Sequence, residues 1–78
     1  MTNEEKYTDV FVDSFGVTAE QAKTLKYQDV ETWDSVGHMT FIANLEDAFD
    51  IEMEADDIVD FSGYEKGKEI LSKYNVSF

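Results

Sequence analysis

An amphipathic run that begins at Ser35 constrains the fold of this chain more than any other feature. Its apolar side chains recur every three or four residues, at Met39, Ile42, Leu45 and Phe49. This spacing is the period of an α-helix, and Glu46, Asp47 and Asp50 fall outside the apolar stripe. The run therefore predicts a helix with Met39, Ile42, Leu45 and Phe49 packed inward and with its acids in solvent.

The N-terminal segment has a second clear helical period. Its apolar positions are Tyr7, Val10, Phe11 and Phe15. Gly16 follows directly, as expected of a glycine that ends a helix. Thr18 and Gln21 have the spacing that caps a short helical turn, and the rest of the stretch up to Trp33 is expected to be loop. Its apolar residues should anchor that loop to the body: Leu25, Tyr27, Val30 and Trp33.

The C-terminal third predicts two more helical pieces. The stretch "ADDIVDF", residues 55–61, reads as a short helix or a single turn. Ser62 and Glu65 have the S-x-x-E spacing of a capping box, which predicts the start of a last helix. The inner face of that helix should hold Tyr64, Ile70, Leu71 and Tyr74. Gly67 either weakens this helix or lets a neighbour approach closely.

These segments together predict an all-α fold: a small bundle of three main helices plus one short helix. A chain of 78 residues forms one domain, 1–78, and the lack of proline favours helices over a turn-rich β fold. Without cysteine there is neither a disulfide nor a thiolate site. No apolar run is long enough for a membrane span, and the N-terminus lacks the features of a signal peptide. We therefore expect a cytoplasmic monomer.

The charge balance is strongly acidic. Eighteen Asp and Glu residues stand against six basic ones, which gives a formal net charge of −12. Such a surface repels nucleic acid and anionic membranes, and it attracts basic patches on other proteins. One hypothesis is therefore an acidic interaction module, for instance a nucleic-acid-mimicking inhibitor that occupies a basic groove.

Ser35 is the candidate for chemistry, and catalysis is the first hypothesis to weigh. His38 lies three residues on, so both side chains could share one side of the helix start. A serine nucleophile also needs an oriented base and an oxyanion site, and no G-x-S-x-G elbow surrounds Ser35. We therefore interpret His38 as a surface or half-buried helix residue, and we expect a non-catalytic protein.

Metal binding is the second hypothesis. Asp50, Glu52, Glu54 and Asp56 alternate like the start of a calcium loop. That loop needs glycine at its sixth position and glutamate at its twelfth, which are Ala55 and Phe61 here. No metal site is predicted.

The third hypothesis makes Ser35 an attachment point. A helix N-terminus offers free backbone N–H groups and the positive end of the helix dipole, so a phosphate on this hydroxyl would be favoured. Asp34 directly before it is an acid beside the same site. The simpler interpretation, that Asp34 or Ser35 only caps the helix, is compatible with modification because caps are exposed.

The run "WDSVGHMTFIANLEDAFDIEMEADDI", residues 33–58, resembles the core of the acyl carrier protein family. That family has Asp-Ser, an apolar residue, and an amphipathic helix that ends in an acidic pair, Phe and Asp. The matching positions are Asp34, Ser35, Val36, Leu45, Glu46, Asp47, Phe49, Asp50 and Ile51. The helix order expected for the whole chain is similar more loosely.

The resemblance implies that Ser35 carries 4′-phosphopantetheine, which a phosphopantetheinyl transferase takes from coenzyme A with a divalent metal. The arm's thiol would hold acyl or aminoacyl groups as thioesters and pass them between pathway enzymes. Implied partners are an acyl-loading ligase and an acyltransferase or synthase with basic patches. The residues implied in docking are Val36, Met39, Glu46, Asp47, Asp50, Asp56 and Asp57.

Some positions depart from the pattern of fatty-acid carriers. Gly37 and Thr40 stand where an acidic residue is frequent, and Trp33 replaces the usual leucine. These departures favour a dedicated bacterial carrier for a specialised biosynthetic pathway. We expect three bulky residues to influence which partner proteins bind this face: Trp33, Met39 and Phe41.

Overall fold

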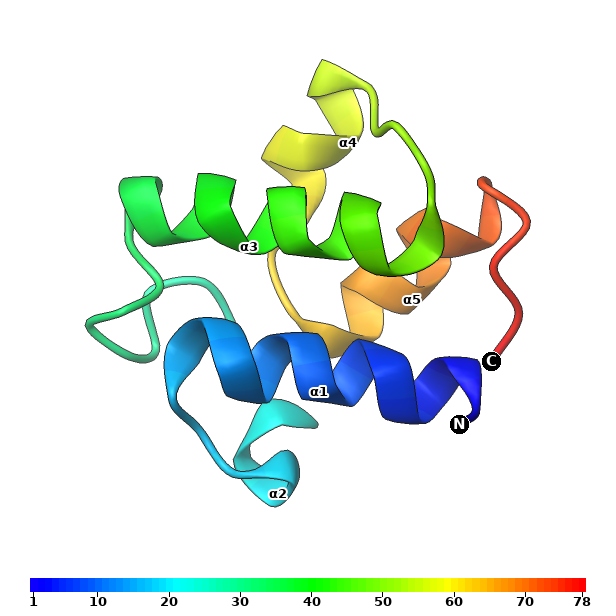
Figure 1. Ribbon diagram of the computed structural model, residues 1–78. Helices are drawn as coiled ribbons and strands as arrows, with labels where there is room; N and C mark the ends of the chain where they lie inside the picture. The colour runs from blue at the N-terminus through cyan, green and yellow to red at the C-terminus, as the bar shows by residue number, and fades with distance from the viewer.

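Five α-helices build the fold, which a computed structural model describes for residues 1–78 (Figure 1). They are α1 (Asn3–Phe15), α2 (Ala19–Ala22), α3 (Ser35–Phe49), α4 (Ala55–Asp60) and α5 (Tyr64–Ser72). There is no β-sheet, and a single antiparallel bridge joins Lys26 to Gly63. The small all-α fold predicted from the sequence is confirmed, with two short helices, α2 and α4, beside the three longer ones.

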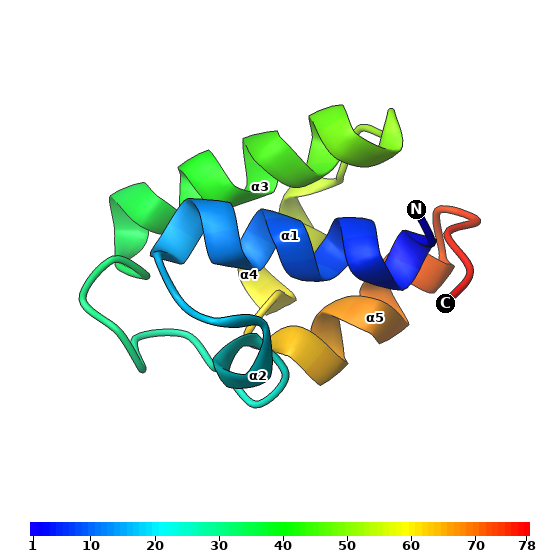
Figure 2. The ribbon, with the colours of Figure 1, turned by 60° about the horizontal axis from the view of Figure 1, so that its bottom comes forward.

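Helices α1 and α3 lie side by side and run in opposite directions (Figure 1). Helix α4 lies between α3 and α5 in the turned view, and α2 covers the side of α1 that faces away from α3 (Figure 2). The two chain ends lie close together beside the start of α1 (Figures 1 and 2). The loop from Lys23 to Asp34 leads into Ser35. Thr32 bonds this loop to the end of α1, which positions the start of α3.

Helix ends follow from local side-chain chemistry. Thr2 and Glu5 form a full capping box at the start of α1, and Gly16 ends that helix in the left-handed conformation, at φ 68°. The capping box predicted for Thr18 and Gln21 is confirmed at the start of α2. Asp50 ends α3 in the left-handed region, at φ 53°.

An aromatic cluster fills the space between the helices. Its buried rings are Tyr7, Phe11, Phe15, Trp33, Phe41, Phe61 and Tyr64. Phe15 stacks on Trp33 with 4.5 Å between ring centroids, and Phe11 meets Phe41 edge-on at 4.6 Å. Each large side chain that is fully buried contributes about 1.5–3 kcal/mol of transfer free energy. The cluster therefore fixes Trp33, and with it the approach to Ser35.

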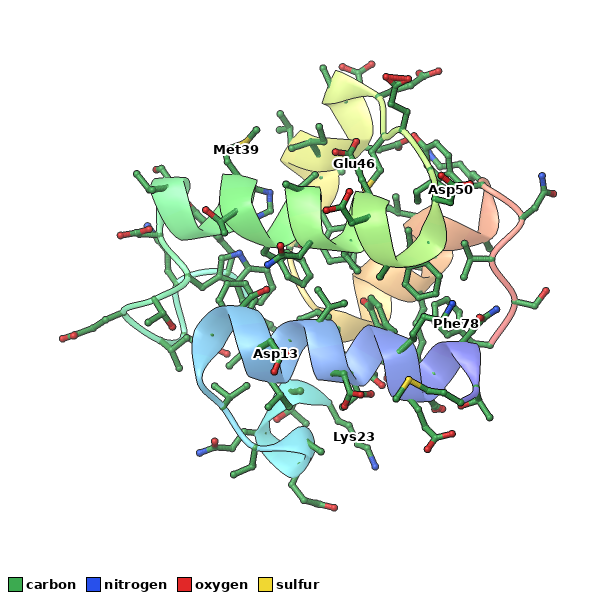
Figure 3. The ribbon with its side chains drawn as sticks, in the orientation of Figure 1. Asp13, Lys23, Met39, Glu46, Asp50 and Phe78 are labelled. Atoms are coloured by element: carbon green, nitrogen blue, oxygen red, sulfur yellow. The ribbon has the colours of Figure 1, made fainter.

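The buried side of α3 differs from the predicted one. Ile42 and Leu45 are buried as expected, but Met39 is 55% exposed and Phe41 is fully buried in its place. The reason is tertiary: α3 packs against α1 and also against Trp33 and Phe61, which turns Phe41 into the core. Met39 points away from α1 (Figure 3).

The capping box predicted for Ser62 and Glu65 is wrong. Helix α5 begins at Tyr64 with Gly63 at its N-cap, and no side chain caps it. The Ser62 carbonyl instead accepts the Tyr27 N–H at 2.9 Å, and the Tyr64 N–H donates to the Leu25 carbonyl at 3.2 Å. Pairing with residues 25–27 holds this backbone extended, so Ser62 cannot reach the first turn.

Gly67 allows a close approach, which was one of the two expectations for it. A Cβ atom there would lie 2.2 Å from both the Phe61 Cζ atom and the Tyr7 hydroxyl. The Tyr7 hydroxyl donates to the Tyr64 carbonyl at 2.6 Å, and burial raises its pKa well above the usual range. Glycine at this position lets α5 pack directly on two buried rings.

Candidate functional site

Ser35 is the first residue of α3, and its side chain is exposed. Asp34 is the N-cap, and its Oδ1 atom accepts the Gly37 N–H at 2.8 Å. The N–H groups of Ser35 and Val36 have no acceptor in the protein. The serine hydroxyl therefore lies beside two free N–H donors at the positive end of a fifteen-residue helix.

Gly37 is explained by the backbone of the preceding loop. A Cβ atom at this position would lie 1.9 Å from the Thr32 carbonyl oxygen. The Thr32 hydroxyl donates to the Phe15 carbonyl at 2.8 Å, which fixes the loop on the end of α1. A larger residue, such as the acid that is frequent two positions after the serine in fatty-acid carriers, does not fit here without moving the loop.

Tyr27 is the hydroxyl partner of Ser35. The Tyr27 Oη and Ser35 Oγ atoms lie 3.5 Å apart, and the Tyr27 backbone is held by the Ser62 carbonyl. Tyr27 was predicted to anchor the loop, and its ring does pack edge-on against Trp33 and His38. The residue is still 36% exposed, and its hydroxyl reaches Ser35. Nothing in the sequence pattern indicated this pairing, because it depends on the bridge between Lys26 and Gly63.

An open groove of about 440 Å³ begins at Ser35 and runs between α3, α4 and the loop before α3. Its lining residues are Tyr27, Ser35, His38, Met39, Ile58, Val59, Phe61 and Ser62. Most of this lining is apolar, although Val59 is 80% exposed and Met39 is 55% exposed. A hydroxyl with an apolar groove beside it can hold an attached group that has an apolar portion.

His38 closes the inner side of this groove. The Trp33 indole N–H donates to His38 Nδ1 at 2.9 Å, and His38 Nε2 lies 2.8 Å from the Ile58 carbonyl. Since Nδ1 accepts, the neutral ring carries its proton on Nε2 and donates it to that carbonyl. His38 was predicted to be a surface or half-buried helix residue, and it is half-buried. With both ring nitrogens bonded elsewhere, His38 is not arranged as a base for Ser35.

Two of the acids predicted to dock partners are held by the fold. The Glu46 carboxylate is half-buried and accepts the Met53 N–H at 2.8 Å, which fixes the turn after α3. Asp57 is 7% exposed and binds both Lys73 and Tyr74 at 2.5 Å. The expectation of a freely solvated acid is therefore wrong for Glu46, and the docking role predicted for Asp57 falls on a buried carboxylate.

The bonds that Asp57 makes also shift the pKa values of Asp57 and Lys73. The hydrogen bond from Lys73, followed by that from Tyr74, lowers the pKa of the Asp57 carboxyl. The same contact raises the pKa of the Lys73 ammonium. Asp57 thus ties α4 to the end of α5, while Asp47, Asp50 and Asp56 remain exposed.

Trp33 and Phe41 were expected to shape partner recognition, and this is wrong because both are fully buried. Val36, at 75% exposure, and Met39 are the large apolar side chains of α3 that are exposed. Glu46 and Asp50 lie on the outer side of α3 with Met39 (Figure 3). No group of three or more His, Asp or Glu side chains is placed to hold a metal ion.

Comparison of the chain with protein-family models, curated proteins and solved structures gives no match. None of the helices has the length and apolar character needed to cross a membrane.

Proposed function

We propose that this chain is an acyl carrier, with Ser35 as the attachment site of 4′-phosphopantetheine. The observation that carries the proposal is the setting of Ser35: an exposed hydroxyl at a helix start, beside two free N–H groups and an apolar groove. The resemblance of residues 33–58 to acyl carrier proteins supports the same assignment.

The residues present fit the arm. The N–H groups of Ser35 and Val36 are free to donate to a phosphodiester, and the helix dipole favours its negative charge. Tyr27 places a further hydroxyl 3.5 Å from the attachment oxygen. The bound arm would supply a thiol that holds acyl groups as thioesters, which a chain without cysteine lacks.

Attachment is a phosphoryl transfer in which Ser35 is the nucleophile. Its Oγ atom forms a bond to the phosphorus of coenzyme A that bears the pantetheine, and the bond from that phosphorus to the bridging oxygen breaks. Adenosine 3′,5′-bisphosphate leaves, and the serine proton passes to a base of the transferase. The chain contributes an accessible hydroxyl and the donors that surround it.

Partner enzymes would meet the same face. Asp47, Asp50 and Asp56 are exposed acids on and after α3, and Val36 and Met39 add apolar contact next to Ser35. Opposite charge on a partner mainly accelerates encounter, and apolar contact then holds the complex. A cytoplasmic biosynthetic enzyme with a basic patch is the kind of partner that this surface suits.

Loading of the arm tests the proposal directly. The purified protein is incubated with coenzyme A, Mg²⁺ and a broad-specificity phosphopantetheinyl transferase, and its mass is measured. We expect a gain of one phosphopantetheine unit in the wild type and in Ser62→Ala, whose exposed hydroxyl lines the same groove. Ser35→Ala should gain nothing while keeping its helical circular dichroism.

One result would reject the carrier function, and another would reject Ser35 as its attachment site. One is an unmodified wild-type protein under conditions that load a known carrier. The other is a Ser35→Ala protein that still gains the mass. The first result would favour the acidic interaction module, and the net charge of −12 would then be the leading feature.

A further inference from the structure

A polar bridge that joins three parts of the chain lines the groove beside Ser35. His38 of α3 accepts from the Trp33 indole in the preceding loop and donates to the Ile58 carbonyl of α4, at 2.9 Å and 2.8 Å. Its ring lies parallel to the Trp33 ring, with 13° between the planes, and stands edge-on to Tyr27. The bridge thus spans the gap between α3 and α4 at the inner wall of the groove.

Aromatic rings occupy the space behind this bridge. Trp33 and Phe41 are fully buried. Phe61, which also lines the groove, is 1% exposed, and its ring centroid lies 5.3 Å from that of Phe41. No buried side-chain nitrogen or oxygen is left without a partner. An apolar chain that passed from the groove into the core would have to displace these rings and separate His38 from its partners.

Separating His38 from Trp33 would leave the indole N–H without its acceptor. The Trp33 N–H is buried, so without His38 it would remain in an apolar environment with no acceptor. A buried donor without a partner is costly, which favours the closed bridge. The groove itself, at about 440 Å³, lies in the lower part of the range for small-molecule sites.

We propose that His38 is a specificity-determining residue that keeps the acyl group in the surface groove and out of the core. The cargo class that follows is short acyl groups, whose whole length the groove accommodates. Longer alkyl chains project into water and gain nothing from the protein. This inference rests on the proposed carrier function, because the acyl group would be attached to Ser35 through the arm.

The test compares acyl groups of increasing length on the same arm. Acetyl, butanoyl, octanoyl and dodecanoyl groups are transferred from coenzyme A analogues with a stable amide in place of the thioester. Mass spectrometry first verifies loading, so failure to load counts against the carrier function alone. Thermal unfolding and the indole N–H resonance of Trp33, the only tryptophan, are then recorded for each form.

For the wild type we expect no further rise in melting temperature from octanoyl to dodecanoyl, and one unchanged indole resonance across the series. In His38→Ala the barrier is gone, so the melting temperature should rise by several degrees from octanoyl to dodecanoyl. The indole resonance should shift and its proton should exchange faster with water. His38→Gln, which retains an acceptor and a donor, should restore the wild-type behaviour. Thr40→Ala, which is exposed on the same helix and lies outside the groove lining, should match the wild-type response to acyl length.

A wild-type protein whose melting temperature climbs through the series while its indole resonance moves would overturn the proposal. So would a His38→Ala protein that folds and still treats octanoyl and dodecanoyl alike. If His38→Ala does not fold, the wild-type series alone decides. The comparison can be repeated without the covalent link by titrating free dodecanoyl pantetheine into the unmodified wild type and His38→Gln. Binding that moves the Trp33 indole resonance of either protein would contradict the closed bridge.

Discussion

Gly37→Ala offers a quantitative test of how the loop and the start of α3 fit together. The added Cβ would lie 1.9 Å from the Thr32 carbonyl oxygen, about 1.5 Å short of the 3.4 Å at which ordinary contact begins. The carbonyl has little freedom to retreat, because the Thr32 hydroxyl is bonded to the Phe15 carbonyl and the next residue, Trp33, is fully buried.

Two effects of opposite sign decide the outcome. Alanine is favoured over glycine inside a helix by about 1 kcal/mol. Overpacking against atoms that cannot move costs about 1–3 kcal/mol, and an overlap with backbone belongs at the upper end of that range. We therefore expect a net loss of about 1–2 kcal/mol, which lowers the melting temperature by roughly 4–16 °C in a domain of this size.

Urea unfolding followed by circular dichroism and Trp33 fluorescence measures this loss. Ala43→Gly is the matched control, because Ala43 is exposed on the same helix and reports the alanine preference without a clash. The cost of the overlap is then the loss in Gly37→Ala plus the loss in Ala43→Gly. A Gly37→Ala protein as stable as the wild type would show that the loop yields freely and that the glycine is not required by the Thr32 carbonyl.

Two further predictions concern the acids. Asp57→Asn should lower the melting temperature near neutral pH. Because folding lowers the pKa of Asp57, its carboxylate contributes fully to stability above the ordinary pKa of 3.8, and this contribution is lost as the pH falls through the folded pKa. The melting temperatures of the wild type and Asp57→Asn should therefore converge in acid. The exposed neighbour variant Asp56→Asn should show no such convergence, and a gap that persists at about pH 2 would contradict the assignment. Asp47→Lys should slow loading by the transferase at low salt and not at high salt, with unchanged stability, whereas Glu46→Lys should also reduce stability because the Met53 N–H loses its acceptor. Equal loading rates for Asp47→Lys and wild type at low salt would remove this acid from the docking surface.

Local patterns predicted the helices well where one short segment decides the outcome. The buried positions of α1 follow its apolar period, and the left-handed turn at Gly16 follows from the freedom of glycine. The cap at Thr18 needs only a residue three positions away. Ser35 was placed at the start of α3 for the same reason, since the apolar period begins there and Asp34 is a good N-cap.

Pairings between distant segments were beyond such patterns. Ser62 and Glu65 have the spacing of a capping box, but pairing of this backbone with residues 25–27 took precedence. The acids around Asp57 give no indication of a bonded partner, and only the packing of α4 beside the end of α5 brings Lys73 to Asp57. The Trp33–His38–Ile58 bridge likewise joins residues whose meeting depends on how α3 and α4 pack.

The six lysines are distributed unevenly along this acidic chain. No Lys or Arg occurs from Tyr27 to Tyr64, the segment that holds Ser35, α3 and α4. Three of the lysines, Lys23, Lys26 and Lys66, instead line a hollow between α2 and the start of α5. In Figure 3, Lys23 points away from the side of the molecule that carries Met39, Glu46 and Asp50.

This uneven distribution bears on how a partner would approach. A net charge alone attracts a basic enzyme to every side of a small protein, whereas an uneven charge also orients it during encounter. No lysine lines the groove beside Ser35, where Val36 and Met39 are exposed. The two lysines that reach α3 and α4 are bonded elsewhere, Lys6 to the Ala48 carbonyl and Lys73 to Asp57. A basic partner steered by this field would arrive at the serine face first, and the lysines beside α2 would disfavour the reverse orientation. For the proposed carrier, charge and apolar contact would therefore favour the same docking geometry, in which the groove and the Ser35 hydroxyl face the partner.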